Sequence, residues 1–179
     1  MHMATARKIW TLDEVHSLPD DGNKYELVRG ELFVTPPPTD EHETISARLT
    51  RLLDPFVAAH RLGFIYRPRA VMRFDKSEVE PDLMVRQPQM GRKAPWDFAP
   101  IPILIVEILS DSTRRRDRQQ KKHFYMDAGV AEYWIVDADE RDVTVVKPGE
   151  MDRVEREELS WMPPGAASAL TLRIEAIFD

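Results

Sequence analysis

The segment that decides the fold is Ile103-Leu104-Ile105-Val106-Glu107-Ile108-Leu109. Its apolar residues occupy both alternating faces, a pattern typical of a central β-strand covered on two sides rather than of a half-solvated edge strand. Glu107 interrupts the pattern, because an unpaired carboxylate inside an apolar strand costs free energy. The segment therefore predicts that Glu107 either reaches solvent or an arginine at the strand end, or binds a metal ion.

The composition limits the class of protein. A chain of 179 residues fits one domain, here residues 1–179, with Met1-His2-Met3 interpreted as a cloning remnant. The absence of cysteine excludes disulfides, thiolate zinc sites and cysteine nucleophiles. Neither a membrane-spanning apolar run nor a signal peptide is present, so we expect a cytoplasmic protein. The net charge of −6 argues against a uniformly basic surface for nucleic acid, although Arg114 to Lys122 form a local basic patch.

The segments around the central strand alternate between strand and helix patterns. We predict a short helix over 11–18, a β-hairpin over 25–28 and 31–34, and an amphipathic helix over 41–60. Short strands are expected at 70–74 and 82–85, as neighbours in one sheet, and a charged helix over 113–128 that ends at Gly129. Strands at 132–136 and 143–146 and a last strand or helix within 154–179 complete the prediction.

Asp82 and Glu107 are the candidate metal ligands. Pro81-Asp82-Leu83 places an aspartate at the start of a short strand, and Glu107 lies near the end of the next one. Such a pair suits Mg²⁺ or Mn²⁺, which take oxygen ligands, usually one or two carboxylates together with water and substrate phosphate. The alternative for Asp82 is a strand-start aspartate that bonds the nearby backbone.

A lysine close to such a metal can orient the attacking water or stabilise the charge that develops on phosphorus. Period-two alternation places residue 109 on the same strand face as Glu107, but that residue is Leu109. On the following helix, Lys121 shares an apolar stripe with Phe124 and Tyr125, so we expect its side chain to face the sheet. The alternative is a lysine that extends along the sheet edge to solvent.

At these positions the chain resembles the Uma-type restriction endonuclease family, a bacterial group within the PD-(D/E)XK nuclease superfamily. The resemblance covers about residues 24–178 and is most specific over 103–137. The matching residues are Tyr25-Glu26-Leu27-Val28-Arg29-Gly30-Glu31-Leu32, His42, Pro81-Asp82-Leu83, Val106-Glu107-Ile108-Leu109-Ser110, Asp117, Lys121, Tyr125, Gly129-Val130 and Glu132-Tyr133-Trp134-Ile135-Val136-Asp137.

The resemblance implies an α/β fold with a restriction-endonuclease-like core, in which helices flank a mixed central sheet and an N-terminal hairpin is added. It implies that Asp82 and Glu107 hold Mg²⁺ or Mn²⁺, that Lys121 replaces the lysine usually found at position 109, and that Glu26 is a further acid of the catalytic site. The activity it implies is hydrolysis of DNA phosphodiester bonds by an endonuclease that acts as a homodimer.

Several alternatives stay open. The acidic net charge and Leu109 favour a nuclease fold kept as a binding or regulatory module without turnover, and a metal-dependent hydrolase of another phosphate ester is a third possibility. Glu26 also fits an outward-facing residue of an ordinary hairpin. His42 fits a helix-start histidine better than a ligand or base. The arginines that would contact DNA phosphates are Arg114, Arg115, Arg116 and Arg118.

Overall fold

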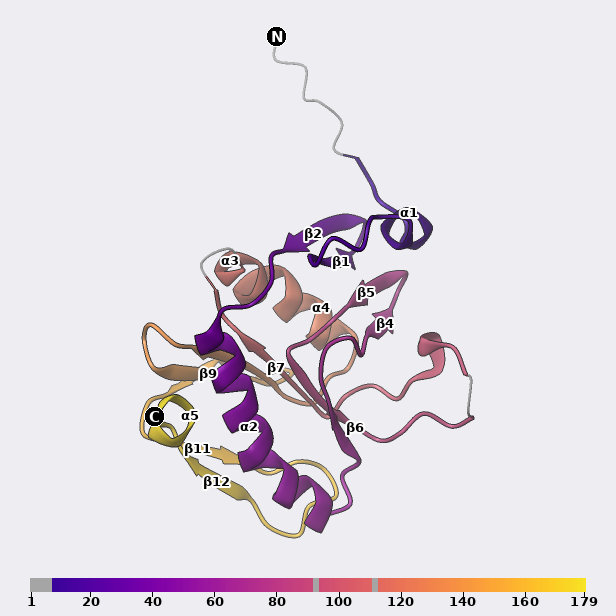
Figure 1. Ribbon diagram of the computed structural model, residues 1–179. Helices are drawn as coiled ribbons and strands as arrows, with labels where there is room; N and C mark the ends of the chain where they lie inside the picture. Colours follow the sequence, from indigo (N-terminus) through magenta and orange to yellow (C-terminus); the bar gives the residue numbers. More distant parts are fainter. Residues whose placement is uncertain (1–7, 92–93, 111–112) are drawn as a thin grey trace.

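The computed structural model describes residues 8–91, 94–110 and 113–179 (Figure 1). Its centre is a six-stranded sheet in the order β10-β9-β8-β7-β6-β3. The strands are β3 (Phe64–Tyr66), β6 (Leu83–Arg86), β7 (Leu104–Ile108), β8 (Tyr133–Asp137), β9 (Asp142–Val146) and β10 (Arg153–Glu155). All five residues of β7 are buried, as the apolar segment predicts. The strands predicted around 82–85, 132–136 and 143–146 are likewise confirmed as β6, β8 and β9.

The sheet is mixed, because β7 and β8 run parallel while the other neighbouring pairs are antiparallel. A parallel pair needs a crossover, which is the helical segment formed by α3 (Arg114–Arg116), η2 (Asp117–Lys121) and α4 (Lys122–Asp127). This segment confirms the predicted helix over 113–128, and Gly129 at φ 85° ends it. The π-helical turn η2 in its middle has no counterpart in the prediction, and such turns are frequent at functional sites.

Apolar side chains cover both faces of the sheet. On one face, Ile45, Leu49, Leu53 and Val57 of α2 (Asp40–Ala59) belong to the core around Trp134. The hairpin of β11 (Glu158–Trp161) and β12 (Leu170–Arg173) and the helix α5 (Glu175–Phe178) also contribute to this core. On the other face, Phe124 and Tyr125 of α4 pack with Ile105 and Tyr133. Figure 1 shows α2 and α4 on opposite sides of β7.

A second, four-stranded sheet has the order β2-β1-β5-β4. The predicted hairpin is confirmed as β1 (Lys24–Val28) and β2 (Glu31–Thr35), and α1 (Leu12–His16) precedes it. The predicted pairing of 70–74 with 82–85 is wrong, because β4 (Met72–Phe74) instead pairs with β5 (Ser77–Val79), which pairs with β1. Asp75 and Lys76 have positive φ angles of 44° and 59° and turn the chain back after β4.

The junction of the two sheets is the segment 80–82, which leaves β5 and enters β6. It brings β1 of the small sheet close to the ends of β6 and β7, so residues far apart in sequence meet there. None of the helices in the described ranges combines the length and apolar character needed to span a bilayer.

Candidate active site

Asp82 and Glu107 lie together at the ends of two central strands, as predicted. Strand β6 pairs with β7 through Leu83 and Val106, so Asp82 is brought alongside the end of β7. The backbone N–H of Ile108 donates a hydrogen bond of 2.8 Å to Asp82 Oδ2. Both carboxylates are nearly inaccessible to solvent, with 6% and 2% exposure. This placement brings together the two acids proposed as metal ligands.

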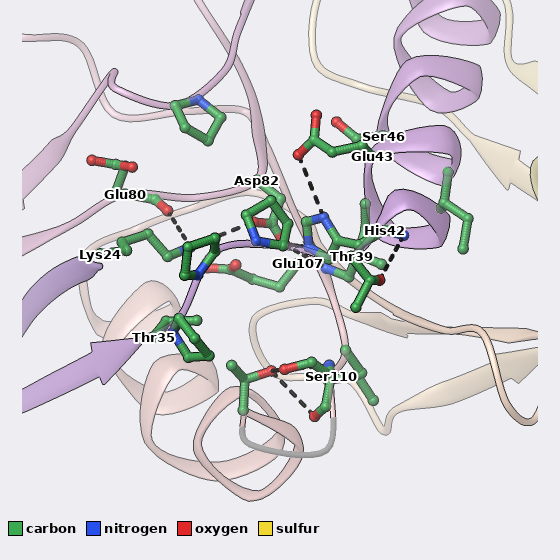
Figure 2. Close-up of a pocket in the computed structure, with 18 of the residues that line it drawn as sticks. Lys24, Thr35, Thr39, His42, Glu43, Ser46, Glu80, Asp82, Glu107 and Ser110 are labelled. Carbon is green, nitrogen blue, oxygen red and sulfur yellow. Dashed lines mark hydrogen bonds and ion pairs between the residues drawn. The ribbon is translucent and has the colours of Figure 1, made fainter. Parts of the chain in front are cut away.

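Both acids line a cavity of about 810 Å³ at the junction of the sheets (Figure 2). Its lining residues come from the start of β1, the end of β2, the first turns of α2, residues 67–69, Glu80 and Asp82, the end of β7 with the residues after it, the start of the crossover helix, and residues 138–139. Lys24, His42 and Glu80 line it as well. The cavity is therefore a space in which a substrate could reach the carboxylates.

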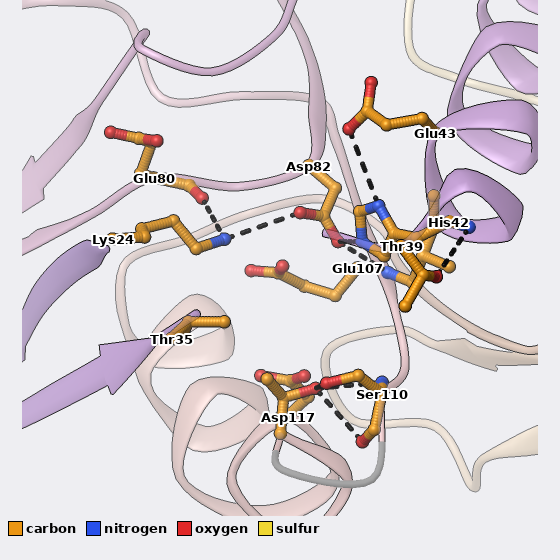
Figure 3. A network of polar contacts seen from close by, with 12 residues as sticks. Lys24, Thr35, Thr39, His42, Glu43, Glu80, Asp82, Glu107, Ser110 and Asp117 are labelled. Atoms are coloured by element: carbon orange, nitrogen blue, oxygen red, sulfur yellow. Dashed lines mark hydrogen bonds and ion pairs between the residues drawn. The ribbon is translucent and has the colours of Figure 1, made fainter. Parts of the chain in front are cut away.

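Two cationic or basic side chains hold Asp82 (Figure 3). Lys24 Nζ lies 3.4 Å from Oδ1 and His42 Nε2 lies 3.1 Å from Oδ2. Burial alone would raise the pKa of Asp82, but Lys24, His42 and the N–H of Ile108 together lower it well below its usual range. Asp82 is therefore ionised at neutral pH, as a metal ligand must be.

Glu107 has a different environment. Lys121 Nζ lies 2.7 Å from Oε1, and the hydroxyl of Tyr125 donates to the same oxygen. None of the described residues donates a hydrogen bond to Oε2. Burial raises the pKa of Glu107, and the negative charges of Asp82 and Asp117 raise it further. The attraction of Lys121 lowers it only in part, and the resulting pKa is about 7. Glu107 therefore exchanges its proton close to neutral pH.

Lys121 and Glu26 lie behind Glu107. The side chain of Lys121 faces the sheet as predicted and is fully buried, and its Nζ lies 2.8 Å from Glu26 Oε1. Glu26 is fully buried too, which excludes the outward-facing interpretation, and it accepts a hydrogen bond from the N–H of Glu80. Although burial opposes it, the charges of Lys121, Lys24 and Arg116 lower the pKa of Glu26 to about 2. Neither Lys121 nor Glu26 belongs to the residues that line the cavity.

His42 lies in the first turn of α2, as expected of a helix-start histidine, and it also contacts the candidate site. Thr39 caps the helix by accepting a hydrogen bond from the N–H of His42. The ring then reaches Asp82 through Nε2, while its Nδ1 is buried without a hydrogen-bond partner in the described chain. Burial lowers the pKa of His42, but the hydrogen bond and charge of Asp82 outweigh it, and the net pKa is raised.

The four arginines that we expected to contact DNA phosphates differ in their surroundings. Arg114 and Arg118 both contact the carboxylate of Asp137, which is buried. Arg116 is buried against Asp117. Of the four, Arg115 alone is classed as exposed. The basic patch is therefore largely built into the protein and does not form one free cationic surface.

Lys24 and Glu80 were missed by the sequence prediction. Lys24 is the first residue of β1, and its Nζ lies 3.0 Å from the carbonyl oxygen of Glu80. The sequence does contain a signal for Lys24, because side chains alternate along a strand and residues 24 and 26 therefore lie on the same face. Once Glu26 faces the acids, Lys24 must face them as well.

The residues present fit Mg²⁺ or Mn²⁺. Asp82 and Glu107 offer hard oxygen donors at the cavity wall, and Oε2 of Glu107 is without a donor among the described residues. Within the described ranges, no group of three or more His, Cys, Asp or Glu side chains could enclose an ion. Two carboxylates are nevertheless enough, because Mg²⁺ usually keeps several water ligands and completes its shell with substrate phosphate.

These ionisations predict a stability maximum near pH 5. Because the pKa of Glu107 is raised from 4.5 to about 7, the folded protein binds more protons than the unfolded chain, and stability falls as pH rises through this interval. The raised pKa of His42 has the same effect above 6.5. Glu26 has a lowered pKa, so its ionised form stabilises the fold above pH 4.5. This contribution to the free energy of unfolding is lost as pH falls from 4.5 toward 2. Urea unfolding should show a decrease of about 1–3 kcal/mol between pH 5 and pH 8.

Glu107→Gln is the matched variant for this prediction, since glutamine resembles the protonated acid at every pH. Its unfolding free energy should vary less than that of the wild type between pH 5 and pH 8. The remaining slope comes from His42 and from Glu80, whose pKa is raised by burial. A wild-type free energy that is level or increases over this interval would contradict the prediction.

Comparisons with known proteins agree on fold and family. The model of the Uma2 family, described as "Putative restriction endonuclease", matches residues 12–175. A solved structure described as a putative nuclease belonging to DUF820 from Anabaena variabilis superposes with a TM-score of 0.80 at 24% identity, covering 94% of this chain and 97% of that one. No protein with a curated description matches. The fold is restriction-endonuclease-like, and the chain belongs to the Uma2 family of putative restriction endonucleases.

Proposed function

We propose that this chain is a metal-dependent endonuclease that hydrolyses DNA phosphodiester bonds, with Asp82 and Glu107 as ligands of Mg²⁺ or Mn²⁺. The observation that carries the proposal is the pair of buried carboxylates side by side on the wall of an 810 Å³ cavity. Membership of the Uma2 family supports a nuclease and suggests DNA as its substrate.

Each residue of the site has a defined part in this proposal. A bound divalent ion supplies Lewis acidity and a more acidic water. Asp82 is held in place by Ile108 and His42, while Lys121 and Tyr125 bind one oxygen of Glu107 and leave Oε2 for the ion. Glu26 shares the ammonium of Lys121 with Glu107.

The rim of the cavity offers positive charge for a DNA strand. Arg67 and Arg69 line it with side chains that are 46% and 68% exposed, and their closest acidic partners lie 3.9 Å and 3.5 Å away. Such long, solvated ion pairs hold an arginine weakly, so DNA phosphates can replace the carboxylates. A homodimer, with one site for each strand of a duplex, is part of the proposal.

A binding module without turnover is the second candidate. Lys24 and Lys121 already contact the two acids, so the site is charge-compensated by the protein itself. An ion must therefore compete with these ammonium groups. This arrangement favours weak metal binding or none.

The test is cleavage of plasmid and linear DNA with Mg²⁺, Mn²⁺ or a chelator. We expect nicking or cutting with either ion, none with the chelator, and a loss of cleavage in Glu107→Gln. Calorimetry with Mn²⁺ separates the candidates: DNA binding without cleavage and without Mn²⁺ binding would overturn the nuclease and support the binding module.

A further inference from the structure

Two lysines lie near the candidate metal ligands, and only one of them faces the cavity. Lys121 is 0% exposed, does not line the cavity, and is fixed by Glu26 and Glu107 at 2.8 Å and 2.7 Å. Lys24 lines the cavity, and its side chain is 16% exposed. A phosphate that enters the cavity therefore meets Lys24 before Lys121.

The ammonium of Lys24 has hydrogen-bonding capacity to spare. Of its three N–H donors, one serves the carbonyl of Glu80 at 3.0 Å, and the contact with Asp82 Oδ1 is long at 3.4 Å. In Figure 3 its Nζ points toward Asp82, with the carboxylate of Glu107 beside it. The ammonium is thus held next to Asp82 by one short contact, the hydrogen bond to the carbonyl oxygen of Glu80.

The other candidates for this role are less suitable. Leu109, at the position where the superfamily carries its lysine, lines the cavity but has no charge. Arg116 lines the cavity, but Thr35, Asp117 and Glu26 occupy its guanidinium. Among the described residues, Lys24 is the lysine or arginine that lies within 4 Å of Asp82.

We propose that Lys24 is the catalytic lysine of this site, which donates a hydrogen bond to a non-bridging oxygen of the scissile phosphate and offsets the charge that develops there. Lys121 is then a positioning residue for Glu107. The inference rests on the proposed nuclease function. It transfers the role expected of Lys121 to a residue of the N-terminal hairpin, and Glu80 becomes the residue that orients the lysine through its backbone carbonyl.

The experiment compares Lys24→Met, Lys24→Arg and the control Lys122→Met. Lys122 lies on α4 outside the cavity and pairs with Asp152. Single-turnover cleavage at saturating Mn²⁺ and DNA should slow at least 100-fold in Lys24→Met, recover in part in Lys24→Arg and stay unchanged in Lys122→Met. DNA affinity measured with Ca²⁺ should change less than about threefold in all three variants, because one phosphate contact adds little to the total.

A second measurement does not depend on cleavage. Binding of thymidine 5′-monophosphate in the presence of Mn²⁺ should weaken at least tenfold in Lys24→Met, whereas Mn²⁺ alone should bind as tightly as in the wild type or more tightly. If the wild type does not cleave DNA, the nuclease proposal fails and this measurement still decides whether Lys24 binds phosphate. Cleavage by Lys24→Met within threefold of the wild type, or unchanged nucleotide binding, would overturn the inference. Should Lys24→Met fail to fold, Lys24→Gln replaces it in both measurements.

Discussion

Asp82→Asn is expected to lower the rate of metal-dependent DNA cleavage by at least about 10³-fold, which corresponds to about 4 kcal/mol of activation free energy. Asparagine has nearly the same shape as aspartate and can still accept the hydrogen bond from Ile108, so the strand end should keep its structure. What the variant loses is the negative charge that Lys24 and His42 now neutralise. Without that charge, a divalent ion loses one of its two carboxylate ligands.

Asp139→Asn is the matched control for this prediction. Asp139 lines the same cavity, but its side chain is 70% exposed and pairs with Arg114 rather than with either candidate ligand. Cleavage by the control should stay within about twofold of the wild type, and Mn²⁺ affinity measured by calorimetry should fall in Asp82→Asn only. An Asp82→Asn protein that folds and cleaves within tenfold of the wild type would remove Asp82 from the metal site.

The part of this site that sequence predicts is the part with a strong local pattern. An acid inside an apolar run marks Glu107, and the helical stripe that includes Tyr125 predicts the inward direction of Lys121. Each of these inferences needs only neighbouring residues. The central strand, the long helix and the crossover helix follow from the same periodicities.

The features that sequence did not predict depend on contacts between distant segments. Strand β5 is three residues long. The turn at Asp75 and Lys76 pairs it with β4, but its pairing with β1 joins Leu27 to Glu78, which are distant in sequence, so local pattern could not place it in the small sheet. Lys24 directly precedes the hairpin predicted over 25–28 and 31–34 and is the first residue of β1 in the structure. Its position beside Asp82 depends on the small sheet, which local pattern does not predict. The π-helical turn η2 brings Asp117 and Lys121 to buried positions without any sequence signal of its own.

Burial is the main cause of the raised pKa of Glu107, and the negative charges of Asp82 and Asp117 add to it against the attraction of Lys121. Glu26, Asp82, Glu107 and Asp117 are buried together with the cations Arg116 and Lys121, and the partly exposed Lys24 contacts Asp82. A proton on Glu107 removes one negative charge from this buried group of acids. A divalent ion can replace that proton, so metal affinity should increase as pH rises through about 7.

Lys121→Met is expected to reduce the free energy of unfolding by about 3–5 kcal/mol at pH 7.5, a large share of the roughly 5–15 kcal/mol typical of a domain. Methionine fills a similar volume but removes the ammonium that lies between the carboxylates of Glu107 and Glu26. At pH 7.5 both acids would then be buried with incomplete compensation. Glu26 would keep the N–H of Glu80 and Arg116 at 3.6 Å, and Glu107 would keep the hydroxyl of Tyr125. Urea unfolding measures the loss. Lys122→Met, the neighbouring residue in a partly exposed pair with Asp152, should cost less than about 1 kcal/mol.

The pattern of rescue distinguishes lost charge compensation from lost packing. Adding Glu26→Gln and Glu107→Gln to Lys121→Met removes the unpaired charges while keeping the side-chain volumes, so the triple variant should regain most of the lost stability. The single variant should also recover in part at pH 5, where Glu107 is protonated, and the triple variant should not depend on pH in this way. If Lys121→Met is as stable as the wild type at pH 7.5, or if the triple variant is no more stable than the single one, Lys121 does not stabilise the acids. The site would then need another source of charge compensation.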